Sequence, residues 1–460
     1  MLRTKKATLE RGLLVERQTA TLERGVPADT QNRSIMIIHS RREFLQLGML
    51  GATGLTLADS LRFAAASELK PKAESVIFVM LQGGASHLDT LDMKPEAPSE
   101  EQGELKPIAS SMPGVPVCEL LPNLGKMLDR FTLIRGISHS TGDHPKACEY
   151  VYTGNRPTPA LVHPAMGCIA GLEKPSAAEL PSFVAVPTTD MNPGYLGVSQ
   201  AAFKTTVVPK AGKPFEVRGL TLPQGLTIDK LRDREQLVAE LDRSFRAVDS
   251  NSALLDGLDR FGKQAQEMIL AQRAQKAFDI SKESPNIVKL FGTDDGSQCM
   301  LLASRLVEHG VRFVTVTLPA WDSHLTIFKE MRTRLCPPLD AGLSGLMQAL
   351  ELKGLLEKTL VVVMGEFGRT PTINKNAGRD HWPRANWALM AGAGVKRANL
   401  VGATDKKGHG PSSGTEIKPD DISATIYNAL GIDHRKEYHT RTGRPVILVP
   451  EGDVIPGVFG

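Results

Sequence analysis

The segment TLVVVMG, residues 359–365, is a run of mainly apolar, β-branched residues that ends at a glycine. Continuous apolarity over this length is typical of a strand buried on both faces, as in a parallel sheet covered by helices. Five other segments have the same character: SVIFVMLQ (75–82), FTLIRG (131–136), FVAVP (183–187), VRFVTVTL (311–318) and NWALMAG (386–392). The sequence therefore predicts an α/β protein with a mostly parallel central sheet.

Helical patterns alternate with these strands. We expect helices at about 117–129, 229–247, 252–282, 296–309, 338–357 and 421–430, the last with an acidic start and a glycine stop. The section at about 190–295 has no clear strand pattern, and we interpret it as a helical insertion over the sheet. Residues 67–460 are then a single α/β sandwich with one insertion.

The composition of the 460-residue chain excludes several classes of protein. A hydrophobic content of 41% and a charged content of 23% describe a packed globule. Ten Lys and Arg against six Asp and Glu stand before residue 67, and the rest of the chain holds 45 of each. A neutral body gives no support for electrostatic nucleic-acid binding. The five cysteines are odd in number and form no CxxC pair, which argues against a disulfide framework and a thiolate zinc site.

The chain begins with a leader. SRREFLQ at 40–46 matches the twin-arginine export signal, and an apolar, glycine-containing stretch and the small residues Ala64–Ala66 follow it. We interpret residues 36–66 as this signal peptide, which makes the twin-arginine translocase a partner and the periplasm or cell envelope the destination. Residues 1–35 repeat ATLERG and lack apolar periodicity, so we interpret them as a mis-called start or a disordered extension.

Polar side chains follow the predicted strands where each strand ends. Ligands of such sheets bind outside the carboxyl ends of the strands. Five of the 11 histidines fall at these positions, together with carboxylates. The candidate ligands are Asp322, His324, Glu366, Asp380 and His381, then His87, Asp89, His139 and His144. Mixed Asp, Glu and His donors suit one or two divalent ions, with zinc, manganese, iron or calcium as candidates.

Several motifs carry a resemblance to a known family. They are SRREFLQLG, GGASHLDTLDMKPEAP, SHSTGDHPKACEYVYTGNRP, VEHGVRFVTV, WDSH, GEFGRTPTIN, GRDHWP and DISATIYNALGID, in order over about 40–450. The sequence resembles the domain of unknown function 1501 family, exported proteins abundant in planctomycetes and some other bacteria. That family is placed in the alkaline phosphatase and sulfatase superfamily, which implies a three-layer αβα sandwich and a two-metal site.

The superfamily resemblance implies roles for single residues. Glu366 stands at a metal-ligand position, and Phe367 stands where phosphatases often have a ligand histidine. Asp322 and His324 are similar to the Asp-plus-His segment of the other metal, and His381 lies near the place of the last ligand histidine. The first strand should end in a metal-binding Asp, but QGG (82–84) stands there, so His87 or Asp89 is the expected substitute.

The nucleophile of the sulfatases has no counterpart here. Counting back from the Thr-Gly helix end at 153–154 places His144 in its position, and Cys148 is expected to be a buried, inert thiol. Water activated by the metal then replaces a covalent nucleophile, with His144 or His139 as a ligand or general acid. Arg369 and Arg379 are candidates to hold an anionic substrate, and for Arg369 a salt bridge to Glu366 or Asp380 is the alternative.

Two functions remain open from the sequence. One is an exported metal-dependent hydrolase of phosphate or sulfate esters, with small anionic, sulfated or phosphorylated carbohydrates as possible substrates. The other is a non-catalytic alkaline-phosphatase-like module for binding or envelope assembly, which the loss of the first-strand Asp and of the nucleophile would fit. The sequence does not indicate an oligomeric state.

Overall fold

The computed structural model describes residues 69–460, apart from 178, 214, 216, 218–271 and 415. These residues belong to one compact unit, Glu68–Gly460. The interpretations of residues 1–35 and 36–66, the helix expected at 229–247 and most of the one expected at 252–282 lie outside the described residues. No helix in the described part is long and apolar enough to cross a bilayer.

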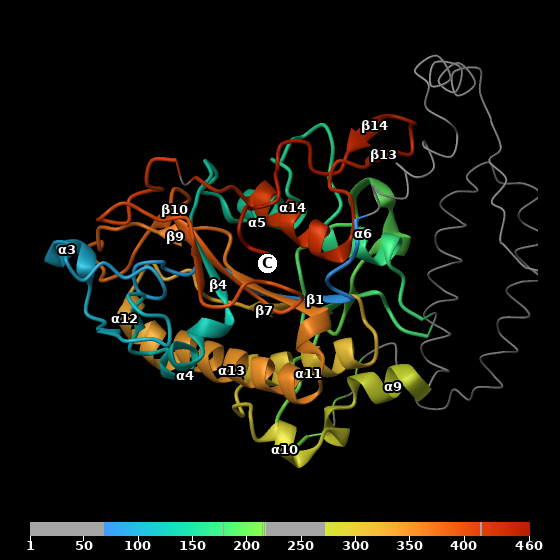
Figure 1. Cartoon of the computed structure of the whole chain (residues 1–460), viewed down its shortest axis with the longest axis horizontal. Coiled ribbons are helices and arrows are strands. Elements are labelled where there is room, and N and C mark those ends of the chain that lie inside the picture. Colours follow the sequence, from blue (N-terminus) through green and yellow to red (C-terminus); the bar gives the residue numbers. More distant parts are fainter. Residues whose placement is uncertain (1–68, 178, 214, 216, 218–271, 415) are drawn as a thin grey trace, which may run out of the picture. The chain divides into compact units, whose positions relative to one another are not determined.

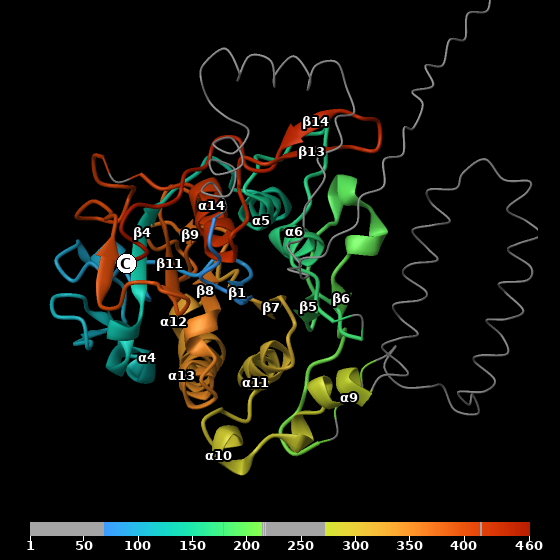
Figure 2. The same ribbon diagram turned by 45° about the vertical axis from the view of Figure 1, so that its right-hand side comes forward.

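An eight-stranded sheet forms the middle of the fold (Figures 1 and 2). Its strands, in spatial order, are β12 (Asn399–Val401), β4 (Thr132–Ile137), β11 (Asn386–Ala391), β8 (Thr359–Met364), β1 (Ser75–Leu81), β7 (Phe313–Leu318), β5 (Phe183–Val186) and β6 (Phe203–Lys204). All neighbours pair in parallel except β11, which is antiparallel to both β4 and β8. The predicted mostly parallel sheet is confirmed, and the six predicted strands all lie in it.

Helices cover both faces of the sheet, which makes the three-layer αβα sandwich that the family resemblance implied (Figure 2). On one face lie α4 (Pro122–Lys126), α9 (Gln272–Phe278), α10 (Pro285–Val288), α11 (Asp295–Glu308) and α13 (Cys336–Leu352). On the other lie α5 (His144–Thr153), α6 (Met166–Glu173) and α14 (Pro419–Leu430). Two short helices, α3 (Ser99–Gln102) and α12 (Ile327–Glu330), lie near the end of the sandwich that carries β9 and β10.

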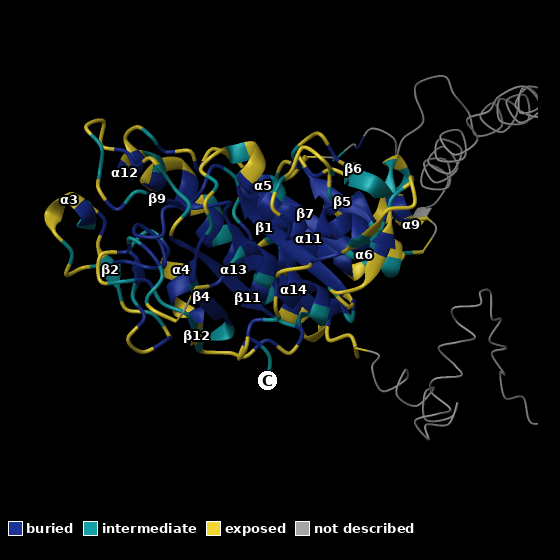
Figure 3. Ribbon diagram, turned by 90° about the horizontal axis from the view of Figure 1, so that it is seen from above, coloured by how far each residue is buried: buried dark blue, intermediate teal, exposed yellow. Residues whose placement is uncertain are grey.

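The alternation of side chains along β1 explains why the sheet needs two covers. Ile77 and Val79 belong to the core that includes α11 and α13, and Phe78 and Met80 belong to the core that includes α5, α6 and α14. Successive strand residues point to opposite faces, so an all-apolar strand is stable only between two helical layers. Every residue of β1 is buried, and Figure 3 shows the central strands in dark blue.

The helix predicted at 117–129 is wrong at its start. Val117–Cys118 is strand β3, paired with β2 (Pro107–Ile108), and the helix α4 begins only at Pro122. Proline disfavours helical geometry in the residue before it and is tolerated in the first helical turn, which accounts for this boundary. The insertion also contributes β6, an edge strand that the sequence pattern did not indicate.

Candidate metal centre

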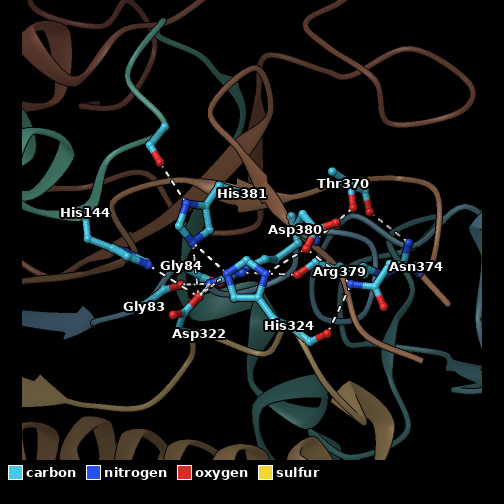
Figure 4. A network of polar contacts seen from close by, with 12 residues as sticks. Gly83, Gly84, His144, Asp322, His324, Thr370, Asn374, Arg379, Asp380 and His381 are labelled. Carbon is cyan, nitrogen blue, oxygen red and sulfur yellow. Dashed lines mark hydrogen bonds and ion pairs between the residues drawn. The ribbon is translucent and has the colours of Figure 1, made fainter. Parts of the chain in front are cut away.

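The candidate site lies at the carboxyl ends of the parallel strands (Figure 4). Asp322 and His324 follow β7, Glu366 follows β8, and His144 opens α5 after β4. His381 precedes β11 in the two-residue strand β10 (His381–Trp382), which pairs with β9 (Gly368–Arg369). Because β11 is antiparallel, its start lies at the edge where the parallel strands end, and this brings His381 to the other ligands.

Three imidazole nitrogens gather around one carboxylate oxygen. Asp322 Oδ1 lies 3.0 Å from His324 Nε2, 3.2 Å from His381 Nε2 and 3.3 Å from His144 Nε2. The Nε2 atoms of His324 and His381 are 2.9 Å apart. Ligands of a tetrahedral zinc ion with bonds of about 2.0–2.1 Å are separated by roughly 3.3 Å. Since the ligand atoms of His144, Asp322 and His381 also lie within 4.8 Å of one another, the spacing fits a metal ion.

The outer nitrogen of each ring lies beside a hydrogen-bond acceptor. Nδ1 of His144 lies 2.6 Å from Glu366 Oε1, Nδ1 of His324 lies 2.7 Å from Asp380 Oδ1, and Nδ1 of His381 lies 2.7 Å from the carbonyl of Gly142. These partners accept hydrogen bonds, so a ring that binds a cation through Nε2 would keep its proton on Nδ1 and donate it to this partner. Carboxylate–histidine pairs of this kind orient metal ligands. In that tautomer the Nε2 lone pairs of the three rings would converge beside Asp322 on one cation.

Glu366 is fully buried, and its carboxylate is bound by the backbone that follows β1. The backbone N–H of Gly83 donates to both carboxylate oxygens, at 2.9 and 3.2 Å. Gly83 has φ of +112°, and a Cβ on it would lie 2.3 Å from the backbone nitrogen of Asp322. Glycine is therefore required where β1 turns beside the site. The hydrogen bond to Glu366 raises the pKa of His144, against the opposing effect of burial.

Arg369 neutralises the ligand carboxylate. Its guanidinium lies 2.6 Å from Asp322 Oδ1 and also donates to the carbonyls of Gly83, Gly84 and Arg379. Burial raises the pKa of Asp322, but the hydrogen bond and charge of Arg369, together with His381, lower it to about 2. Arg369 therefore favours the ionised form of Asp322.

A sequence model of the family described as Protein of unknown function (DUF1501) matches residues 73–459. This chain belongs to the DUF1501 family. No curated protein matches it.

Solved structures similar to this DUF1501 protein come from sulfatases and phosphatases. The phosphonate monoester hydrolase of Agrobacterium radiobacter is 10% identical, with a TM-score of 0.37 over 85% of this chain and 77% of its own. The PsFucS1 sulfatase from Pseudoalteromonas sp. is 11% identical, with a TM-score of 0.31 over 86% and 72%. A TAB5 alkaline phosphatase mutant with bound Mg is 11% identical, with a TM-score of 0.36 over 78% and 99%.

The structure of the DUF1501 protein divides the predicted ligands into two groups. Asp322, His324 and His381 reach the centre as expected, and His144 joins them although it was in the second rank. Glu366 and Asp380 instead bind the outer nitrogens of two of these histidines. All three Nε2 atoms have Asp322 Oδ1 as a close neighbour, so the four donor atoms fit one ion better than two.

His87 and Asp89, predicted as ligands, lie apart from this centre and have other partners. Asp89 is fully buried and forms an ion pair with Arg379, with its carboxylate 2.6 Å from Nε and 3.2 Å from a terminal nitrogen of the guanidinium. His87 is also fully buried, and its Nε2 lies 2.8 Å from the carbonyl of Gly408. Neither residue belongs to the metal-compatible cluster found among the described residues. The turn at Gly83, rather than a substitute ligand, replaces the expected first-strand Asp.

The two arginines and His139 are engaged with neighbouring groups of the protein. Arg369 and Arg379 are both fully buried, so neither guanidinium is available to a substrate, and the ion pair of Arg369 is with Asp322 rather than Glu366 or Asp380. His139 lies 2.8 Å through Nε2 from the carbonyl of Glu366, while its Nδ1 accepts from the N–H of Thr141 at 3.2 Å. With both ring nitrogens engaged and its pKa lowered by burial, His139 is unsuited to be a ligand or a general acid.

Phe367 forms the apolar wall of the centre. Its ring centroid lies 4.9 Å from that of His144 and 4.8 Å from that of His381. A phenylalanine at the position of a common ligand histidine therefore packs against two ligands and adds no donor. Cys148 is buried within α5, where burial raises its pKa well above the usual range, so the expected inert thiol is confirmed.

Proposed function

We propose that this protein is an exported hydrolase of phosphate or sulfate esters that uses a single divalent ion, for which zinc, manganese and iron are the best candidates. The observation that carries the proposal is the convergence of three Nε2 atoms on Asp322 Oδ1, with Nδ1 of each ring bound to an acceptor on its outer side. Nitrogen-rich donors of this kind suit these ions better than calcium, which prefers oxygen. The similar sulfatases and phosphatases support the same class of reaction.

The residues around the centre would have two roles: some would bind the ion and others would orient those ligands. Asp322, His144, His324 and His381 would hold the ion. When bound, a divalent ion supplies polarisation of an ester oxygen and acidification of water near neutral pH. Arg369 keeps Asp322 ionised, so the carboxylate remains available as a ligand.

Attack by water, rather than by a side chain, fits the environment of α5. The position that carries the nucleophile in sulfatases is occupied here by His144, whose Nε2 points to Asp322. The nearby thiol of Cys148 is buried and protonated, so it is not a nucleophile. The site needs a water molecule because the described residues around it offer no activated hydroxyl or thiolate.

Export by the twin-arginine translocase is part of the proposal. This route carries folded proteins, which would allow the ion to be bound in the cytoplasm before transport to the periplasm or envelope. Replacing Arg41 and Arg42 by lysine should retain the protein in the cytoplasm, as measured by cell fractionation. Periplasmic protein from that variant would contradict the proposed route.

Elemental analysis of protein purified without chelators tests the centre directly. We expect about one equivalent of zinc, manganese or iron in the wild type, and loss of this metal in Asp322→Ala and His324→Ala. His439→Ala is the matched control, because this histidine is exposed on β13 (Glu437–His439), which pairs with β14 (Pro445–Ile447). A folded wild type that binds none of these ions on reconstitution would refute the proposal.

The loaded protein should hydrolyse 4-nitrophenyl phosphate or 4-nitrophenyl sulfate, and the chelated protein should not. Metal at full occupancy without turnover of any ester would instead favour the non-catalytic binding or assembly module. The two functions are thus separated by activity measured at known metal content.

A further inference from the structure

A pocket of about 1070 Å³ opens beside the metal centre. His381 belongs to both: its Nε2 lies 3.2 Å from Asp322 Oδ1, and its ring forms part of the pocket wall. The pocket slightly exceeds the range of about 300–1,000 Å³ that is typical of small-molecule sites. It therefore has room for considerably more than one phosphate or sulfate group.

Four cationic side chains line this pocket: Lys146, Arg156, Arg384 and Lys418. They come from distant parts of the chain, namely the start of α5, the loop after it, the turn before β11 and the residue preceding α14. Glu416 is the one acidic side chain in the lining, and it accepts a hydrogen bond from the hydroxyl of Ser138 at 2.9 Å.

The cations of the pocket are mostly without partners. Among the described residues, no carboxylate lies within ion-pair distance of Lys146, Arg384 or Lys418, and Arg156 has Glu451 at 3.9 Å, between two exposed groups, and the hydroxyl of Tyr150. The buried carboxylate of Asp420 lies near Arg156 and Lys418 but outside ion-pair distance. Like charges that face one concave space repel one another and raise the local potential, which favours a multiply charged anion. Residues 67–460 hold equal numbers of basic and acidic side chains, so this excess of cations is a local feature of the pocket.

The uncharged part of the lining fits a sugar. The indole of Trp382 is half-buried in the wall, held by a hydrogen bond of 2.9 Å from Nε1 to the carbonyl of His409. Exposed hydroxyls of Ser140 and Ser413 lie in the same lining. An aromatic face with hydroxyl donors and acceptors is suited to the faces and hydroxyl groups of a saccharide ring.

We propose that this pocket is a second anion subsite, and that the protein binds an oligosaccharide carrying several sulfate or phosphate groups, one at the metal centre and others on Lys146, Arg156, Arg384 and Lys418. This inference rests on the proposed function in one respect: the ester group bound at the metal centre is the one that is hydrolysed. The binding itself is a property of the pocket and can be measured without metal.

A fluorescein-labelled, highly sulfated hexasaccharide is the probe, titrated by fluorescence anisotropy into chelated protein. We expect saturable binding that weakens with salt, and no binding of the desulfated hexasaccharide. Lys146→Gln combined with Lys418→Gln should weaken the affinity about tenfold or more, because two charge-assisted contacts are lost. The matched control removes two lysines elsewhere: Lys289→Gln with Lys396→Gln, both exposed and outside the lining, should change it less than twofold.

Equal affinities of the two double variants, or the absence of binding to the wild type, would overturn the subsite. Tighter binding of a single-stranded oligonucleotide of equal charge would overturn the choice of a saccharide. Both double variants should unfold at a temperature close to that of the wild type, which would show that a loss of affinity does not come from misfolding. Because the protein is metal-free in this assay, failure of the proposed hydrolysis leaves its result unaffected, and the two failures are distinguishable.

Discussion

Replacing Glu366 by glutamine distinguishes an outer partner from a direct metal ligand. Glutamine keeps an oxygen that can accept from His144 Nδ1, now at 2.6 Å, and from the N–H of Gly83, now at 2.9 Å. The substitution removes the negative charge of the carboxylate. A hydrogen bond to a charged group contributes about 1.5–3 kcal/mol and a neutral one about 0.5–1.5 kcal/mol, so the change costs roughly 1–1.5 kcal/mol. That corresponds to about a tenfold weaker metal affinity, at the lower end of the roughly 10–100-fold range for outer partners.

The assay is a titration of zinc or manganese against a competing chelator at constant pH, for the wild type, Glu366→Gln and Asp322→Ala. We expect a modest loss for Glu366→Gln and a much larger one for Asp322→Ala, because only the latter removes a donor atom. Thermal unfolding of the metal-free proteins checks that the glutamine side chain is accommodated.

Two results would refute this reasoning. A loss for Glu366→Gln as large as that for Asp322→Ala would mean that Glu366 binds the ion directly, as the family resemblance implies. An affinity within twofold of the wild type would mean that the carboxylate has no part in orienting His144.

Three further predictions concern stability and reactivity. Asp89→Asn leaves the buried guanidinium of Arg379 without its counter-charge and should destabilise the protein by about 3–5 kcal/mol in urea unfolding, whereas Asp453→Asn at an exposed site should change stability little. Gly83→Ala places a methyl group against the backbone beside the site at positive φ, so we expect a loss of at least ~1–3 kcal/mol and weaker metal binding; a wild-type Tm and metal affinity would contradict this. All five cysteines are buried, with burial raising the thiol pKa to about 12 for three of them, so a thiol reagent at pH 8 should react with none until the protein is unfolded; rapid reaction of folded protein would contradict the described packing.

The sequence was most informative where one physical constraint dominates. Segments buried on both faces must be continuously apolar, so β1, β7 and β8 were predictable from their residues alone. The helix α5 was equally predictable, because Asp143 caps its start and Gly154 ends it in the left-handed conformation. The rule that ligands collect at strand ends predicted that Asp322 and His324 lie at the carboxyl end of β7, as the structure shows.

The division into ligands and outer partners could not be predicted in this way. Glu366 and His144 lie on different elements, and which of them faces the ion depends on a few ångströms set by the turn at Gly83. His87 and Asp89 have suitable residue types near the right strand end, but burial beside Arg379 gives Asp89 a different partner. The glycine pair after β1 was the available signal, since it marks a close approach of backbone rather than a missing ligand.

The antiparallel direction of β11 has a consequence for how this site can vary. The chain leaves the sheet at Gly365 and returns at Asn386 on the same edge, so the intervening residues need no helix crossing behind the sheet. That single excursion carries Glu366, Arg369 and His381, hence one ligand and two of the groups that position the others. The excursion is also tied to the rest of the fold, because Arg379 within it pairs with buried Asp89 and Arg369 binds the backbone at Gly83 and Gly84. Exchanging it between related chains should therefore alter metal preference and the adjoining pocket, but preserve folding only where these buried partners are kept.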